Sequence, residues 1–163
     1  MRYRQTTRRI PALALALLAT PALAQEPVGN VTGTLDGAPI SCRFQPDQSH
    51  FLGFGTSRTV SILTSRCEGV AGQIALGFEQ TGDSIDLVEI SLRGFDTSHL
   101  FGNSDTGAML ALHSASEGGD VLSLSGTLSA RLGTSDDHGR TIDHSAARLL
   151  EVSFDGVIAP LQN

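Results

Sequence analysis

The sequence predicts an all-β fold, an antiparallel β-sandwich of about eight or nine strands. Apolar and polar residues alternate along several segments, as they do in strands that bury one face. No window of ten or more residues after residue 24 shows a helical repeat of apolar residues. The 18 glycines are spread along the chain, which suits frequent turns. An up-and-down β-barrel is the alternative architecture, because the same alternation fits a sheet closed on itself.

Residues 1–24 have the pattern of a cleavable signal peptide. Four arginines, the first of them Arg2, precede an apolar stretch over residues 10–19, and Ala22-Leu23-Ala24 supplies a cleavage site before Gln25. The apolar stretch is shorter than the roughly 20 residues of a membrane-spanning helix. We therefore expect one β domain over residues 25–163, periplasmic or secreted, with no transmembrane segment in the mature chain.

The first strands of this domain are predicted as a hairpin. Residues 31–35 alternate, Asp36-Gly37 supplies the turn, and residues 40–44 alternate again. Asp-Gly between two alternating segments is a strong signal for a two-residue hairpin turn. Segment 47–58 alternates less cleanly and is predicted as a short buried strand, with an exposed apolar docking loop as the alternative.

Later segments alternate in the same way and predict the remaining strands. Their expected inward-facing residues are Val60, Ile62, Ile74, Leu76, Phe78, Val88, Ile90, Leu92, Leu122, Leu124, Leu128, Ala130, Leu132, Leu150, Val152, Phe154 and Ile158. The pattern over 108–114 is shorter and does not decide between strand and loop.

The charge balance excludes nucleic acid as a partner. The formal net charge of the whole chain is −6, and loss of the four leader arginines leaves seven basic residues against 17 acidic ones, a net charge of −10. Binding to phosphate backbones needs clustered positive charge instead. Tyr3 also lies in the leader, so the mature chain has neither Tyr nor Trp to stack on sugar rings. The candidate substitutes are Phe51, Phe54, Phe95 and Phe101, of which the last two flank one loop.

The two cysteines predict a disulfide. Cys42 and Cys67 both follow the cleavage site, and an even pair in an exported chain indicates one structural bridge. Their spacing is far from the C-x-x-C of redox-active pairs. The bridge also favours an oxidising compartment.

One loop carries candidate metal ligands. Asp136, His138, Asp143 and His144 lie between two predicted strands, and imidazole together with carboxylate suits zinc or a related divalent ion. The alternative is a polar, solvated loop in which Asp and Gly make turns.

Catalytic motifs are incomplete in this sequence. Asp105-Thr106-Gly107 has the letters of the aspartic-protease motif but follows a predicted turn instead of an apolar strand. Ser104 lacks the G-x-S-x-G elbow and the strand–turn–helix that such an elbow needs. The sequence predicts no catalytic residue and no cofactor other than the metal considered above.

These observations favour an exported, soluble, non-catalytic binding or accessory domain of the cell envelope. It would contact a protein or another envelope component through loops or a sheet edge. The first alternative is a divalent-metal-binding protein or metal-dependent enzyme that uses the 136–144 loop. The second is a carrier of small apolar ligands, which requires the barrel and an internal cavity. The sequence does not predict the oligomeric state.

Overall fold

The computed structural model describes residues 28–70, 72–94 and 99–162. These residues form ten β-strands and two short 3-10 helices, so the all-β prediction is confirmed, with ten strands where eight or nine were expected. The strands are β1 (Val28–Leu35), β2 (Ala38–Arg43), β3 (His50–Phe54), β4 (Ser57–Leu63), β5 (Gly72–Thr81), β6 (Ser84–Gly94), β7 (His99–Asn103), β8 (Met109–Gly118), β9 (Val121–Thr134) and β10 (Asp143–Pro160). The 3-10 helices are η1 (Pro46–Gln48) and η2 (Ser104–Thr106).

The predicted signal peptide, residues 1–24, and Phe95 lie outside the described residues. Within the described part, no helix is long and apolar enough to cross a membrane.

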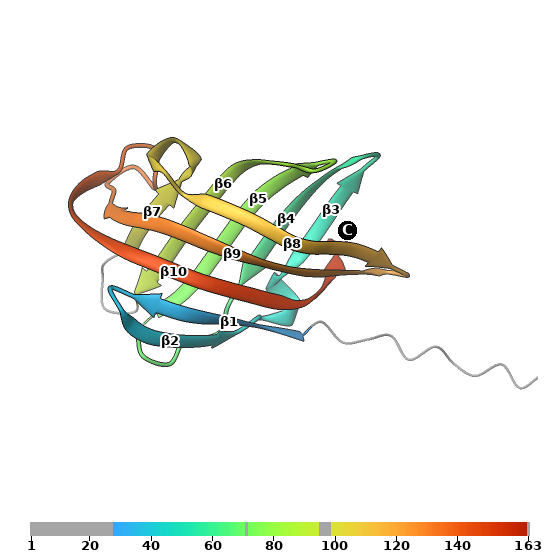
Figure 1. Cartoon of the computed structure of the whole chain (residues 1–163), viewed down its shortest axis with the longest axis horizontal. Helices are drawn as coiled ribbons and strands as arrows, with labels where there is room; N and C mark the ends of the chain where they lie inside the picture. Colours follow the sequence, from blue (N-terminus) through green and yellow to red (C-terminus); the bar gives the residue numbers. More distant parts are fainter. Residues whose placement is uncertain (1–27, 71, 95–98, 163) are drawn as a thin grey trace, which may run out of the picture.

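Backbone pairing links all ten strands into one sheet that bends into two layers. One layer has the order β2-β1-β10-β9-β8 and the other β3-β4-β5-β6-β7, and the strands of the two layers cross (Figure 1). The layers are joined at two corners, where Ala159 of β10 pairs with His50 and where Leu100 of β7 pairs with Thr134 of β9. The β10–β3 contact is parallel and the other strand pairings are antiparallel.

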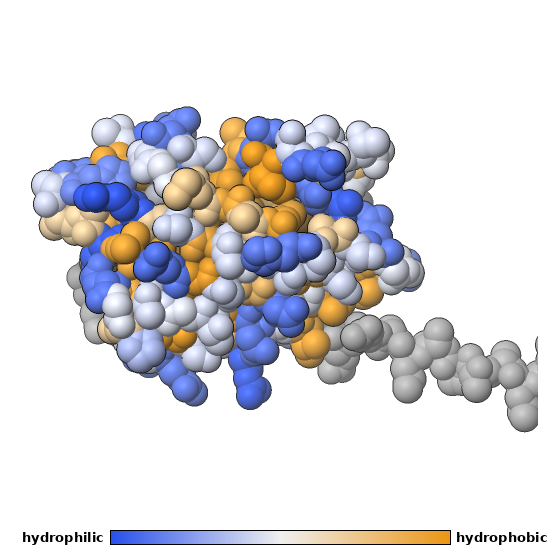
Figure 2. Space-filling model, in the orientation of Figure 1, coloured by the Kyte–Doolittle hydropathy of each residue, from blue (hydrophilic) through white to orange (hydrophobic). Residues whose placement is uncertain are grey.

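The apolar core fills the space between the layers. Every residue predicted above to face inward in β4, β5, β6, β9 and β10 is buried, and Leu122, Leu132, Leu150 and Ile158 have no exposed surface. Removal of this apolar surface from water is the main favourable contribution to folding. Figure 2 shows apolar surface in the upper middle of the molecule, where Figure 1 places β8 near β5 and β6.

The segment predicted as a short buried strand is a strand, but only its beginning is buried. Phe51 of β3 lies in the core, whereas Leu52 is 36% and Phe54 69% exposed. Phe54 lies three positions after Phe51, so its side chain is on the opposite face of β3, away from the core.

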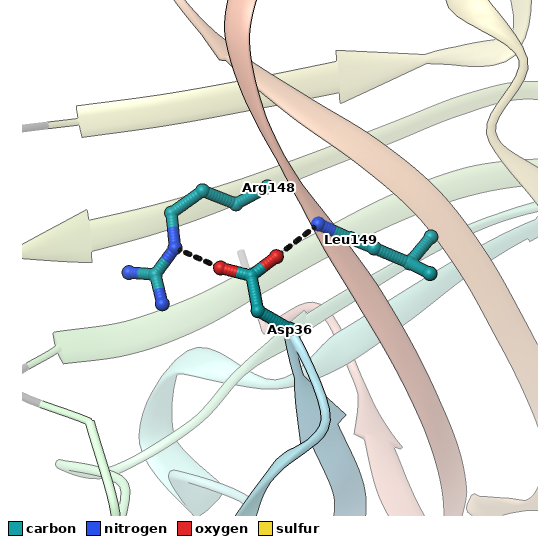
Figure 3. A network of polar contacts seen from close by, with 3 residues as sticks. All are labelled: Asp36, Arg148 and Leu149. Carbon is teal, nitrogen blue, oxygen red and sulfur yellow. Dashed lines mark hydrogen bonds and ion pairs between the residues drawn. The ribbon is translucent and has the colours of Figure 1, made fainter.

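The first hairpin forms as predicted, and its turn is tied to β10. Asp36 (φ 52°) and Gly37 (φ 80°) both adopt the left-handed conformation that a type I′ turn requires. The Asp36 carboxylate accepts hydrogen bonds from Arg148 Nε (2.6 Å) and from the Leu149 backbone N–H (2.8 Å), as Figure 3 shows. The pKa of Asp36 is lowered, mainly by the hydrogen bond from Arg148.

The Cys42–Cys67 disulfide is present and holds a backbone segment against the outer edge of β2. Ser41 N–H donates to Glu68 O (3.2 Å) and Glu68 N–H donates to Ser41 O (2.7 Å). Ser65 N–H donates to Arg43 O (2.8 Å) on the same side. The outer edge of β2 is therefore covered at Ser41 and Arg43.

Candidate binding surfaces

The loop between β9 and β10 folds onto itself through its own side chains. Ser135 Oγ accepts a hydrogen bond from Gly139 N–H and donates one to Asp137 Oδ1, both at 2.8 Å. Asp137 Oδ1 also accepts from Thr141 N–H at 2.8 Å. These hydrogen bonds, the one from Thr141 first, lower the pKa of Asp137 to about 2, so its carboxylate is ionised at neutral pH.

The four predicted metal ligands are not brought together as one group. In the described residues, no three His, Cys, Asp or Glu side chains lie where they could hold a metal ion. Asp143 accepts hydrogen bonds from Ser145 N–H (2.8 Å) and Ser145 Oγ (3.0 Å). The ring nitrogens of His144 are buried without a hydrogen-bond partner, and His138 lines a groove described below. Metal binding by Asp136 and these three residues stays a prediction.

The residues of the incomplete catalytic motifs have structural contacts. Ser104 Oγ accepts a hydrogen bond from Val88 N–H at 2.9 Å and lies 3.4 Å from Val88 O. Asp105 lies in η2, whose first turn is closed by a reciprocal capping box between Asn103 and Thr106. This short helix connects β7 to β8.

A groove of about 550 Å³ lies on the outer face of β4, β5, β6 and β7. Small residues form much of its floor, among them Ala75, Gly77 and Ser91. The 138–140 turn forms one wall and packs on Phe101. A Cβ atom on Gly139 would lie 2.9 Å from Phe101 Cδ1, and the φ of 92° at Gly139 is itself unfavourable for other residues. Glycine at this position therefore allows the loop to close over the groove.

Charged side chains of both signs surround this groove. Arg93 and Arg140 supply positive charge, and Glu89 and Asp105 supply negative charge. Within the described part of the chain, none of these four side chains makes a hydrogen bond or an ion pair. Their polar atoms are thus available to a ligand.

Sequence reasoning missed this groove. The sequence feature that could have indicated the groove is a set of small residues at outward positions of neighbouring strands, such as Ala75 and Gly77 in β5 and Ser91 in β6. Outward positions in a solvated sheet more commonly carry larger polar residues.

A second hollow, of about 570 Å³, lies between β8 and the hairpin formed by β5 and β6. It is lined by residues 110–115 of β8 and, across from them, by Gln80, Asp83 and Ile85. Leu87 (65% exposed) and Met109 (68% exposed) are among the most exposed large apolar residues of the described chain, and they lie on these same two strands, β6 and β8.

Comparison of the chain with protein-family models, curated proteins and solved structures finds no match. Function has to be inferred from the chemistry of these two surfaces.

Proposed function

We propose that the chain is an exported, non-catalytic binding domain of the cell envelope and that the groove over β4–β7 holds its ligand. The observation that carries this proposal is the set of four unpaired charged side chains around one groove with a floor of small residues. Unpaired charges of both signs at one concave site are suited to a ligand that carries both signs. The signal-peptide pattern and the disulfide support export.

The ligand class follows from the groups at the rim. Guanidinium groups such as those of Arg93 and Arg140 bind carboxylates with paired hydrogen bonds. Glu89 and Asp105 accept hydrogen bonds from ammonium and hydroxyl groups. A soluble muropeptide, a disaccharide that bears a short peptide, carries all of these groups. The muropeptide therefore serves as the test ligand that represents the envelope component.

Export predicts a defined mature N-terminus. Protein recovered from the periplasmic or culture fraction should begin at Gln25 and contain no free thiol, because the leader is removed and both cysteines are bridged. N-terminal sequencing and thiol titration of the fractionated protein measure this. Full-length protein confined to the cytoplasm would contradict the export part of the proposal.

Groove binding predicts localised spectral changes on titration with a muropeptide. In ¹⁵N-labelled mature protein, the amide signals of Gly77, Ser91, Gly102 and Gly139 should shift, since all four residues line the groove. Loss of two charge-assisted hydrogen bonds in the double variant Arg93→Ala/Arg140→Ala should weaken binding by about tenfold or more.

Arg43→Ala is the matched control, because this exposed arginine lies on β2, in the other layer, and does not line the groove. It should leave the affinity unchanged. The groove is not the ligand site if the four amides do not shift, or if Arg43→Ala weakens binding as much as the double variant.

A further inference from the structure

In the described residues, no backbone group pairs with the outer edge of β8, whose register against β9 shifts between Leu112 and Ser114. β8 pairs with β9 on its other side. The opposite end of the same layer is different, since the disulfide-held segment covers the edge of β2. An exposed strand edge presents unpaired N–H and C=O groups that can pair with another extended chain.

β6 leaves an opening beside this edge. β7 pairs with β6 only over residues 89–93, so residues 84–88 have no strand partner on the side toward β8. The backbone N–H of Val88 donates a hydrogen bond to Ser104 Oγ (2.9 Å), at the point where β6 no longer pairs with β7. The preceding residue, Leu87, has a φ of 49°, and the register of β5 against β6 shifts at this point. These features direct β6 away from regular pairing with β8.

The opening between the two strands contains four half-buried apolar residues among mainly polar groups, of which Asp83 carries a negative charge. Leu110, Leu112 and Ala115 of β8 and Ile85 of β6 are half-buried there and pack against the core. Asp83 lines the opening near the turn from β5 to β6. At the far end of β8, Glu117 forms an ion pair with Arg58 Nη1 at 3.3 Å.

We propose that the β8 edge accepts an extended segment of a partner protein as an added strand. The backbone of the segment pairs with β8, and alternate apolar side chains enter the opening between β8 and β6 and cover Leu110, Leu112 and Ile85. Basic residues that flank these apolar positions meet Asp83, and the net charge of −10 on the mature chain attracts them.

A lone segment fits this opening better than a second copy of the chain. The hollow is bounded by β8 on one side and by the β5–β6 hairpin on the other. A strand that already belongs to a folded sheet has a neighbouring strand on one side, and this neighbour would have to share the same space. The opening is separate from the groove over β4–β7, so the two sites are tested independently.

The test uses a synthetic peptide with three alternating valines, Arg-Thr-Val-Thr-Val-Thr-Val-Arg, blocked at both ends. Calorimetry should give saturable one-to-one binding, and amide hydrogen exchange of residues 110–115 should slow at least tenfold in the complex. An analogue with an N-methyl group on every residue cannot donate to β8 and should not bind. An analogue with glutamate in place of both arginines should bind more weakly, with a difference that shrinks at high salt.

Two neighbouring variants locate the site on the protein. Ala115→Arg places a long side chain in the floor of the opening and should weaken peptide binding at least tenfold. Ser116→Arg introduces the same side chain at an exposed position that does not line the opening and should bind normally. Thermal unfolding checks that both variants fold.

Asp83→Asn, at an exposed position, should remove the preference for flanking arginines even if Ala115→Arg is unstable.

Equal binding of the N-methylated and unmodified peptides would overturn the proposal, because strand pairing would then contribute nothing. Equal binding by Ala115→Arg and the wild type would also overturn it. A concentration-dependent dimer that Ala115→Arg abolishes would assign the edge to a second copy of the chain instead. Sedimentation of both proteins without peptide measures this.

Discussion

Removal of the Cys42–Cys67 disulfide lowers the free energy of unfolding by about 3–4 kcal/mol on the loop-entropy model. The bridge joins residues 25 positions apart, and without it the unfolded chain gains the freedom of an open loop. The double variant Cys42→Ala/Cys67→Ala avoids placing hydroxyl groups at two buried positions. Urea unfolding of the variant and of the oxidised wild type measures the difference.

Removal of the disulfide should also expose the outer edge of β2. Ser65 and Glu68 pair with β2 close to the bridge, so their backbone hydrogen bonds should open more readily without it. Amide hydrogen exchange should therefore accelerate at Ser41, Ser65 and Glu68 before it accelerates in β9 or β10. Unfolding midpoints that agree within error between the oxidised and the thiol-reduced wild type would show that the bridge adds no stability.

Replacement of Phe78 by alanine lowers the free energy of unfolding by about 3–5 kcal/mol. Phe78 of β5 is 2% exposed and is among the largest fully buried side chains. Alanine leaves a cavity beside the irregular pairing of β5 with β6, and rigid strands in both layers limit how far the core can collapse into it.

Phe54→Ala is the matched control for this substitution. Phe54 is 69% exposed, so its truncation should change the free energy of unfolding by no more than about 0.5 kcal/mol. Urea unfolding of the two variants gives the comparison. Similar losses for Phe54→Ala and Phe78→Ala would mean that the core does not lie between the layers as described.

The buried face of each strand could be predicted because it depends on a local period of two residues. In β9, the alternation of Leu122, Leu124 and Leu128 with serine and threonine predicted the side that lies in the core. The turn at Asp36-Gly37 was predictable for the same reason, since its conformation depends on those two residues. The disulfide was predictable because the chain has only two cysteines.

The buried face of a short segment that alternates poorly was not predictable from its own pattern. Phe51 and Phe54 lie three positions apart and so face opposite sides of β3, and only the packing of the second layer decides that the side with Phe51 is the buried one. The 136–144 loop shows a similar limit. Its composition suggested metal ligands, while the direction of each side chain depends on the Ser135 and Asp137 hydrogen bonds and on contact with Phe101.

The sequence by itself determined the all-β class, the inward face of most strands, the first turn and the cysteine pairing, because each depends on neighbouring residues or on a choice without alternatives. Only the tertiary structure decided which strands meet. β9 pairs with β7, β8 and β10, and this leaves β8 with a free edge. The groove lies over four consecutive strands, β4–β7, and also needs the distant 138–140 turn to pack on Phe101. Each candidate surface therefore includes a contact between segments that are distant in sequence, and such contacts depend on how whole strands pack around one core.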